Sequence, residues 1–573
     1  MNTELTGVLV TFLMSILLAW PLAKYIARVF AGEKTFTDFM APVERIILRI
    51  CRIDPTREMN WKEFLKAMLT INLLWFVYGF FMLIFQGHLP LNPDGNPGQT
   101  ADLAFNTISS FVTNTNLQDY SGETGATYLT QLFVFTFLQF TSAATGIACL
   151  VALFNAFRHR TTRNVGNFWS IFIKSITRLL LPLSVILAVI LAFNGTPTSF
   201  RGKDTITTLQ GDTQQVSRGP AAAMIAIKQL GTNGGGYFGA NSAVPLENPN
   251  YLTNMVEAIS IILVPIALLF SFGFYTGRKK LSYIIFGVMS VFFVSFCINN
   301  IYFETHGNPA IARMGISQHT GAMEGKEVRF GAAATGYWSV ATTSTSNGSV
   351  NGMHDSLMPL SGAAILIDMM INALYGGVGV GLLNYFIFIV IAVFISGLMV
   401  GRTPEFLGHK VEAREVKIAA IVTIVCAFFI KVGTALASYI LVHHPNANWD
   451  EKPSAWLANP GFHGFSEMLY QYTSCTANNG SGFEGLGDNS IWWNVSGGVV
   501  MLLARFLPII GPVAIAGLLG SKKFIPPSAG TLRTDSITFG VMTMAVIIIV
   551  TALSYFPPLA LGPIAEYFNL YAK

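Results

Sequence analysis

The sequence predicts an all-α polytopic membrane protein with four span–pore-helix–span repeats around a central pore and one extra span at each end, ten spans in total. Three observations predict this fold. Of the 573 residues, 52% are hydrophobic and only 11% are charged, whereas a soluble globular chain carries about 25% charged residues. The apolar residues form runs about as long as the ~20 residues that a helix needs to cross a bilayer. Short polar motifs of one type recur between these runs, which indicates an internal repeat.

The recurring motifs begin with Thr, Ser or Asn, continue with Asn, and end in small or polar residues. We name them loops 1 to 4: TNTN at 113–116, TNGG at 232–235, SNGS at 346–349 and NNGS at 478–481. They recur every ~115 to 130 residues, and each precedes an apolar run. A single Asn-Gly pair is a common turn, but four near-regular copies favour four structural units built round these loops.

The N-terminal segment, 1–62, contains the first span at 6–30 and a basic stretch after it. Cytoplasmic loops carry an excess of Lys and Arg, so Lys24 and Arg28 predict that this end of the span is inside and the N-terminus outside. Residues 44–52 (ERIILRICR) have the pattern of a short amphipathic helix at the inner surface.

The first repeat, 63–163, has predicted spans at 67–85 and 129–157. The loop between them contains Asp and Glu but neither Lys nor Arg, which predicts that it is outside. Within this loop, 102–112 is apolar but too short to cross the membrane. We expect a half-helix there, entering the membrane from outside and stopping at loop 1.

The same unit recurs in repeats 164–280, 281–415 and 416–523, and 524–573 contains the last span. The predicted spans and half-helices of these parts are 168–193, 219–230, 256–275, 281–303, 357–400, 418–442, 464–472, 492–519 and 537–556. In this topology the basic stretches RHRTTR, GRKK, GRTPEFLGHK and Lys522–Lys523 all fall on the cytoplasmic side, and both termini lie outside.

The four loops have the chemistry of a cation site. Non-helical backbone inside a membrane is tolerated where it lines a cavity or is buried in protein. A half-helix points its unpaired carbonyls and the negative end of its dipole at such a cavity. Neither Asp nor Glu occurs within the four motifs, so neutral oxygens suit a weakly hydrated monovalent ion better than Ca²⁺ or Mg²⁺. The alternative is that all four are ordinary extracellular turns.

The return run of the third repeat is too long for one span and contains GGVGVG at 376–381. Its glycines, at positions 376, 377, 379 and 381, each cost a helix roughly 1 kcal/mol relative to Ala. We interpret Gly376, Gly377, Gly379 and Gly381 as a hinge that gates the pore below the loops. The alternative is close helix packing through small residues.

Arg505 lies in the middle of an apolar run. A cation at that depth is expensive and marks a functional position. The alternative is an interhelical salt bridge, with Asp368 as the candidate partner. Lys174, Arg178 and Lys431 are less informative because long side chains can snorkel to the interface. His443, His444 and His463 are interpreted as solvated residues of outer loops.

Several absences exclude other function classes. The sequence contains neither the DKTG motif of a P-type ATPase nor a P-loop, so we expect no ATP hydrolysis and no catalytic residues in this chain. The five cysteines have no CxxC spacing, which argues against disulfides or a zinc site. No basic face interleaved with aromatic residues predicts nucleic-acid binding. An intramembrane enzyme is disfavoured because no nucleophile–base motif is present.

TNTN, TNGGGYFG (232–239), NNGSGFEG (478–485) and GRTPEFLGHK resemble the potassium-transporting A-subunit family of the bacterial Kdp ATPase, over essentially the whole chain. The sequence is more distantly similar to the Trk/Ktr/HKT potassium transporters. The resemblance implies a potassium filter with Gln118 beside it and Arg505 on the ion pathway. The implied filter residues are Thr113, Asn114, Thr115, Thr232, Asn233, Gly234, Ser346, Asn347, Gly348, Asn478, Asn479 and Gly480.

The resemblance further implies a bacterial plasma-membrane complex in which the partners are a P-type ATPase (the B subunit), the C subunit, and a small single-span protein. This chain would bind potassium as substrate, use no organic cofactor, and depend on its partner for ATP. The alternative is a self-sufficient channel or symporter of the Trk/Ktr class, driven by a gradient. Four repeats alone need eight spans, so the two extra spans favour the pump component, because they offer surface to partners.

Overall fold

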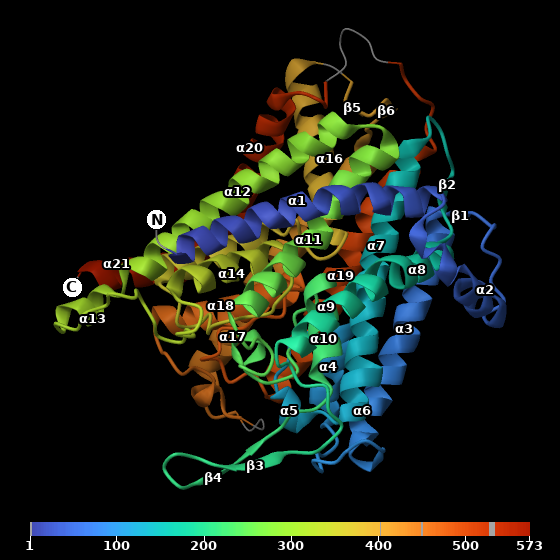
Figure 1. Ribbon diagram of the computed structural model, residues 1–573. Helices are drawn as coiled ribbons and strands as arrows, with labels where there is room; N and C mark the ends of the chain where they lie inside the picture. Colours follow the sequence, from blue (N-terminus) through green and yellow to red (C-terminus); the bar gives the residue numbers. More distant parts are fainter. Residues whose placement is uncertain (1–2, 402, 448–450, 527–532, 573) are drawn as a thin grey trace.

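The computed structural model describes residues 3–401, 403–447, 451–526 and 533–572 and is dominated by helices (Figure 1). In this described part, ten helices are long and apolar enough to cross a membrane, which confirms the predicted fold class. Arg402, one of the basic residues of the expected cytoplasmic loops, lies outside the described residues.

The N-terminal span lies against a helix of the second repeat rather than against its neighbour in sequence. α1 (Thr3–Ala31) packs along α11 (Tyr251–Thr276), and Gly7 permits the contact because a Cβ there would lie 2.3 Å from the Tyr251 hydroxyl. η1 (Phe36–Met40) and α2 (Ala41–Ile50) follow. α2 is the amphipathic helix that the sequence predicts at 44–52.

The first repeat begins where Asn60 caps a helix. Its Oδ1 accepts hydrogen bonds from the backbone N–H groups of Lys62 and Glu63, which would otherwise be unpaired at the helix start. The half-helix α4 packs against α3 and against α19 of the fourth repeat. The elements are β1 (Met59–Asn60), α3 (Trp61–Phe85), η2 (Gln86–His88), α4 (Ala101–Val112), α5 (Gly122–Gly125), α6 (Tyr128–Thr130), η3 (Gln131–Thr136) and α7 (Phe137–Arg158).

The second repeat adds a protruding hairpin before its half-helix. Strands β3 and β4 pair antiparallel, with Asp204 opposite Val216, and project at one end of the molecule (Figure 1). β2 pairs with β1 of the first repeat. The elements are β2 (Asn164–Gly166), α8 (Phe168–Lys174), η4 (Ser175–Leu180), α9 (Leu181–Phe193), β3 (Asp204–Thr207), β4 (Thr213–Val216), α10 (Ala221–Leu230), η5 (Asn241–Ala243) and α11.

The third repeat has a divided return segment, as its over-long apolar run predicts. α15 ends at Ile371, and α16 begins at Val380, so Gly376, Gly377 and Gly379 lie in the break at 372–379, whereas Gly381 lies in the first turn of α16. The half-helix α14 precedes loop 3. The elements are α12 (Lys279–His306), α13 (Pro309–Arg313), α14 (Ala332–Ser344), α15 (Pro359–Ile371), α16 (Val380–Val400), β5 (Glu405–Phe406) and β6 (His409–Lys410).

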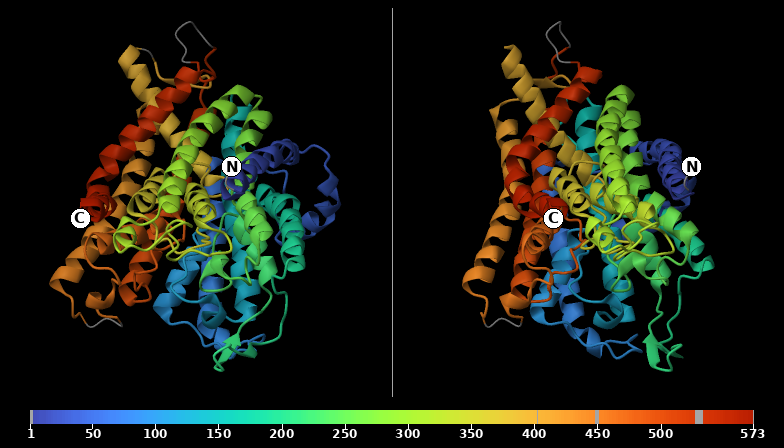
Figure 2. Two further views of the ribbon diagram at one scale, coloured as in Figure 1. Left: turned by 60° about the vertical axis from the view of Figure 1, so that its left-hand side comes forward. Right: turned by 90° about the vertical axis from the view of Figure 1, so that its left-hand side faces the viewer.

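The fourth repeat and the last span complete the bundle. α20 lies against α12, α15 and α16 of the third repeat and against α17, and Figure 2 shows the red C-terminal helix beside them. The elements are α17 (Ala413–His443), η6 (Pro453–Ala455), α18 (Phe462–Ala477), α19 (Ile491–Gly520), α20 (Ile537–Leu559), η7 (Ala560–Ile564) and α21 (Ala565–Ala572).

The molecule has two distinct ends. We call the end that carries the β3–β4 hairpin, which leads into half-helix α10, the hairpin face. We call the end that carries β5 and β6, within the basic connection from α16 to α17, the basic face (Figure 1). The four half-helices α4, α10, α14 and α18 are largely buried between the spans, and the loops that follow them are buried as well.

Arg178 fastens the amphipathic helix α2 to the second repeat. Its Nε and Nη2 donate to the two carboxylate oxygens of Glu44 at 2.6 and 2.7 Å, and its Nη1 donates to Asp38 at 2.6 Å. The side chains of Arg178 and Glu44 are only 9% and 7% exposed. Arg178 is therefore a buried anchor, and not a side chain that reaches the interface for solvation.

We predict that Glu44→Gln destabilises the protein by about 3 kcal/mol at pH 7, because it leaves the Arg178 charge buried with a weaker partner. Burial favours the neutral form of Glu44, but hydrogen bonds from Arg178 and Thr177 outweigh it and hold its pKa below the ordinary 4.5. A carboxyl whose pKa is lowered on folding stabilises the folded state fully above pH 4.5, and this stabilisation is lost as the pH falls through the folded-state pKa. The difference in thermal midpoint from wild type should therefore shrink in acid.

The matched control for this prediction is Glu33→Gln. Glu33 pairs with Arg28, and both side chains are more than half exposed, so its loss should cost less than about 0.5 kcal/mol. Equal melting midpoints for the two variants in detergent at pH 7 would contradict the anchoring role of Arg178.

Candidate functional site

The four loops share one backbone pattern. In each, two positions separated by one residue have positive φ, between 47° and 96°, and the residue between them donates its N–H to the carbonyl five residues earlier, at 2.8 to 3.0 Å. The positive-φ pairs are Asn114 and Asn116, Thr232 and Gly234, Ser346 and Gly348, and Asn478 and Gly480. The middle residues are Thr115, Asn233, Asn347 and Asn479.

This pattern corrects the register of loop 1. The sequence motif aligns Thr113, Asn114 and Thr115 with Thr232, Asn233 and Gly234, whereas the backbone aligns Asn114, Thr115 and Asn116 with them. Thr113 is instead the C-cap residue that follows half-helix α4. The other three loops have the register that the motif predicts, including Ser346, Asn347 and Gly348 in loop 3.

Two of the left-handed positions are strained for the residues that occupy them, Thr232 and Ser346. Asn tolerates positive φ, but a β-branched residue such as Thr232 rarely adopts it. Such strain persists where surrounding contacts enforce it, commonly at functional sites. In each loop the sign of φ alternates, because a residue of negative φ lies between the two positive-φ positions.

Close backbone contacts join the loops in sequence. A Cβ on Gly234 would lie 1.9 Å from the carbonyl oxygen of Asn347, and one on Gly348 would lie 2.0 Å from that of Asn479. A Cβ on Gly480 would lie 2.0 Å from the carbonyl oxygen of Thr115. Each glycine therefore touches the middle residue of the next loop, and a side chain at any of the three would collide with it.

Side-chain amides complete the ring of loops. Asn114 Nδ2 donates to the carbonyl of Thr232 at 2.8 Å, and Asn233 Nδ2 donates to Asn114 Oδ1 at 2.6 Å. Further side-chain amides join neighbouring loops or their half-helices: Asn347 Nδ2 donates to the carbonyl of Lys228 (3.0 Å), Asn479 Nδ2 to the carbonyl of Thr342 (2.8 Å) and Asn478 Nδ2 to Thr115 Oγ1 (3.1 Å). Loops 1, 2, 3 and 4 thus form a closed, buried ring.

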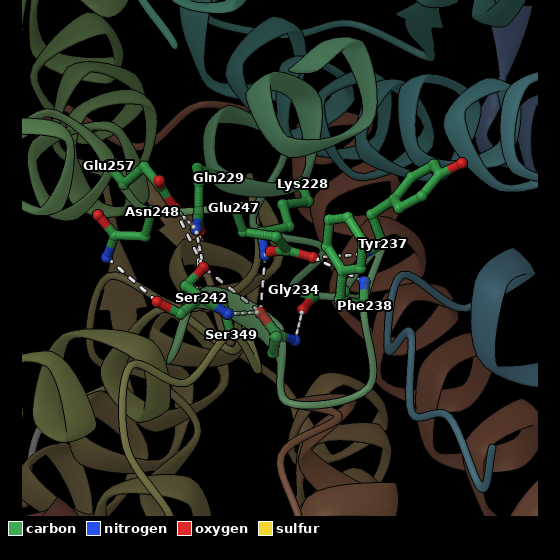
Figure 3. A network of polar contacts seen from close by, with 12 residues as sticks. Lys228, Gln229, Gly234, Tyr237, Phe238, Ser242, Glu247, Asn248, Glu257 and Ser349 are labelled. Atoms are coloured by element: carbon green, nitrogen blue, oxygen red, sulfur yellow. Dashed lines mark hydrogen bonds and ion pairs between the residues drawn. The ribbon is translucent and has the colours of Figure 1, made fainter. Parts of the chain in front are cut away.

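A buried charged network supports loop 2 (Figure 3). Lys228, on half-helix α10, forms an ion pair with Glu247, and both side chains are 0% exposed. Glu247 Oε1 accepts the backbone N–H groups of Tyr237 and Phe238 at 2.5 and 3.0 Å. Lys228 also donates to Asn241 Oδ1 at 2.6 Å, and Asn241 Nδ2 donates to the carbonyl of Gly234 at 2.6 Å. The pair therefore holds TNGGGYFG at Gly234, through Asn241, and at Tyr237 and Phe238.

A second part of this network joins loop 2 to loop 3. Gln229 Nε2 donates to Glu257 Oε2 at 2.8 Å, and Ser349 Oγ donates to Gln229 Oε1 at 3.0 Å. The sequence motifs do not include these residues, because Lys228 and Gln229 lie within the apolar half-helix before loop 2, and Glu247 and Glu257 lie beyond the end of TNGGGYFG at Gly239. Lys228, a lysine inside an apolar stretch, is the sequence feature that indicates a buried charged network here.

Gln118 does not lie within the ring but holds its second loop. Its Oε1 accepts the N–H of Gly236 at 2.8 Å, and its Nε2 donates to the carbonyl of Gly236 at 3.2 Å. The side-chain amide thus pairs with the backbone of Gly236 as a neighbouring strand would. Gln118, two residues after loop 1, thus holds Gly236, the residue that follows loop 2.

The glycine-rich break contacts loops 2 and 3 directly. Gly376 donates its N–H to the carbonyl of Ser344, the last residue of half-helix α14, at 2.8 Å. Val378 donates its N–H to Thr232 Oγ1 at 2.8 Å. The break therefore lies at the carboxyl ends of half-helices α10 and α14.

Arg505 lies beside this break, and Asp368 is held elsewhere. A Cβ on Gly377 would lie 3.4 Å from Arg505 Nη1. Arg505 is 3% exposed, and within the described chain its Nη2 has no hydrogen-bond partner. Asp368 Oδ2 instead accepts hydrogen bonds from Thr343 and Ser344 at 2.8 and 2.6 Å. The geometry therefore gives no support to the alternative of an Arg505–Asp368 salt bridge.

Comparisons with known proteins identify relatives of the whole chain. The family model of the potassium-transporting ATPase A subunit matches residues 9–568. The chain is 61% identical, over the full length of both proteins, to a potassium-transporting ATPase potassium-binding subunit of Flavobacterium johnsoniae. It is 48% identical to the protein of that name from Alicyclobacillus acidocaldarius, over 99% of this chain and all of the relative.

A solved structure resembles the fold. The potassium transporter TrkH from Vibrio parahaemolyticus aligns with a TM-score of 0.50 at 14% identity, over 89% of this chain and 98% of that chain. At this identity the likeness concerns the fold alone, and it agrees with the predicted four-repeat pore architecture.

We predict that Gly234→Ala weakens potassium binding by tenfold or more. Its φ of +83° is costly for Ala, by roughly 1–2 kcal/mol, and the new Cβ would displace the Asn347 carbonyl. The control is Gly482→Ala, two residues past the ring, where nothing lies within 4 Å of a Cβ. Isothermal titration of both purified variants with K⁺ checks this, and equal affinities would contradict the packing of loop 2 against loop 3.

Proposed function

The chain belongs to the potassium-transporting ATPase A subunit family, and on that basis we propose that it takes potassium ions from outside the cell through a four-loop selectivity filter and passes them to a partner ATPase. The observation that carries the proposal is the closed ring of neutral backbone and amide groups at the ends of four half-helices. Carbonyl rings of this kind replace the hydration shell of a monovalent cation.

The filter that we propose consists of the left-handed and middle positions of each loop. Asn114, Thr115 and Asn116 take the place of the triplet expected from sequence in loop 1, with Thr113 at the half-helix end. Thr232 to Gly234, Ser346 to Gly348 and Asn478 to Gly480 supply the other three sides. The half-helices add the negative ends of their dipoles, which favour a cation.

We propose that the hairpin face is outside the cell and the basic face is cytoplasmic, with both termini outside and the protein in the plasma membrane of a bacterium. The excess of Lys and Arg in the connections at the basic face supports this orientation. The B subunit would hydrolyse ATP, while the C subunit, together with a small single-span protein, would complete the complex. The bilayer surrounds the spans, and potassium is the substrate.

The ion route below the filter has two proposed elements. Gly376 to Gly381 would act as a gate at the carboxyl ends of the half-helices, and Arg505 would repel cations from the path straight through this chain. At an effective dielectric constant near 20, two charges 4 Å apart interact by about 4 kcal/mol. That is enough to direct the ion sideways toward the partner ATPase rather than across the membrane.

The gate can be tested at Gly377 without disturbing packing. A Cβ there meets its nearest neighbour at 3.4 Å, so Gly377→Ala should fold normally and bind potassium with wild-type affinity. Because Ala reduces backbone freedom in the break, we expect the transport rate of the assembled complex to change severalfold. Lost binding with a parallel loss of transport would contradict the gate.

The pump-subunit proposal and its channel alternative differ in what the isolated chain does. We expect the purified wild-type chain in liposomes to pass little potassium. Arg505→Met should raise that leak about tenfold for each ~1.4 kcal/mol of barrier lost, and it should lower potassium uptake per ATP in the complex. Arg505→Lys keeps the charge and is the control. Rapid selective flux through the isolated wild-type chain would favour the self-sufficient channel instead.

A further inference from the structure

A cluster of metal-ligand side chains lies apart from the loop ring. His463 and Glu467 lie one turn apart near the start of α18, so they share a helix face, and Asp355 comes from the segment that follows loop 3. One ligand atom from each of the three lies within 4.8 Å of the other two. The cluster joins residues that are more than a hundred positions apart in the chain.

Glu467 is the member of the cluster that has an unpaired carboxylate oxygen among the described residues. Its side chain is 0% exposed, and its Oε2 has no hydrogen-bond partner among the described residues. Its other oxygen accepts a hydrogen bond from Asn459 Nδ2 at 3.1 Å. A buried carboxylate oxygen without a donor is costly, and a cation in the cluster would remove that cost.

Gly485 leaves space beside the carboxylates. A Cβ at this position would lie 2.4 Å from Glu467 Oε1 and 2.8 Å from Asp355 Oδ2, so any other residue would intrude on the cluster. A cavity of about 440 Å³, lined by Asp355, Asn459, His463 and Glu566 among others, connects the cluster with the surface. An ion and a water ligand could therefore reach it.

His463 is oriented as metal-binding histidines usually are. Its Nδ1 lies 2.8 Å from Glu566 Oε1 of α21, and its Nε2 lies 2.9 Å from Asp355 Oδ1. A carboxylate that accepts the Nδ1–H fixes the tautomer in which Nε2 is free to bind a metal. Glu566 is thus placed to orient the ring while Asp355 and Glu467 share the ion with Nε2.

We propose that Asp355, His463 and Glu467 bind a divalent transition-metal ion of the zinc type. One imidazole and two carboxylates form a ligand set that Zn²⁺ accepts at about 2.0–2.2 Å, with water in the fourth position. Imidazole selects against Mg²⁺ and Ca²⁺, which prefer oxygen ligands alone. Binding displaces the proton of His463 Nε2, which leaves to solvent, and it forms the metal–nitrogen bond in its place.

The alternative to a bound metal ion is a proton on His463 Nε2. Burial opposes the charged imidazole, but hydrogen bonds to Asp355 and Glu566 outweigh it and raise the pKa of His463 to about 10. The charged ring would then bridge the two carboxylates without any metal. The protonated ring would leave Glu467 Oε2 without a hydrogen-bond donor, whereas a metal ion would bind the Glu467 carboxylate. A substitution of Glu467 therefore distinguishes the two states.

The site is coupled to loop 4 through stacked rings. The Phe483 ring stacks on His463 with centroids 5.8 Å apart and on Tyr470 at 4.2 Å. The Tyr470 hydroxyl lies 2.7 Å from Ser481 Oγ, beside Gly480. A bound ion would therefore tie the third repeat, the fourth repeat and α21 together next to one side of the ring.

The test uses the full chain, purified in detergent without a polyhistidine tag and stripped with EDTA. Titration with Co²⁺ should produce visible absorption bands, with one ion bound per chain, and Zn²⁺ should abolish them by displacement. Zn²⁺ should also raise the thermal midpoint by several degrees. These readouts need no transport activity, so their outcome is independent of the proposed function.

The decisive variant is Glu467→Gln, which keeps the size of the side chain and removes the charge. We expect at least a tenfold loss of Co²⁺ and Zn²⁺ affinity, with His463→Gln similar and His444→Gln, outside the cluster, equal to wild type. Absence of Co²⁺ bands in wild type would overturn the metal site in favour of the protonated bridge. Equal binding by wild type and Glu467→Gln would place the bound ion elsewhere and overturn the proposal. Saturation by Ca²⁺ or Mg²⁺ with equal affinity would overturn a site of the zinc type.

Discussion

The contact on which the candidate site depends is the approach of a glycine in one loop to a peptide carbonyl in the next. Gly234, Gly348 and Gly480 each touch the middle residue of the following loop, at distances that leave no room for a Cβ. In a ring built this way no loop can move alone, because a shift in one backbone displaces the next carbonyl. The spacing of the oxygens is thus set by backbone contact, which is stiffer than side-chain packing, and a stiff ring suits discrimination between ions of similar size.

Strain in the ring is balanced by buried polar groups behind it. Thr232 and Ser346 hold left-handed conformations that their side chains disfavour. Lys228 and Glu247 are fully buried charges, and such a pair contributes little net stability once desolvation is counted. Its value lies in geometry, because Glu247 accepts two backbone N–H groups that follow loop 2 and Lys228 fixes Asn241 against the Gly234 carbonyl. The charges hold a backbone shape that neutral side chains would hold less firmly.

The sequence predicted the repeats, the ten spans and the break in the third repeat, because these features follow from the length and hydrophobicity of local segments. The register of loop 1 could not be predicted, since TNTN contains both a Thr-Asn-Thr and an Asn-Thr-Asn triplet and only the φ angles distinguish them. The supports of loop 2 and the His463 cluster were also missed. Asp355 lies 108 residues before His463, and their proximity depends on how the third and fourth repeats pack.

In the glycine break, close packing and a gating function do not exclude one another. Gly376 and Gly381 face each other so closely that a Cβ on either would meet the other's Cα within 2.7 Å, and Gly379 has a φ of +90° and touches the Gly146 carbonyl of α7. These three glycines are required by the fold. Gly377 is different, because a Cβ there meets only ordinary contacts with Arg505 and Ser346. Packing therefore explains three of the four glycines, and any gating function must be sought at Gly377, where the break, loop 3 and the buried guanidinium meet.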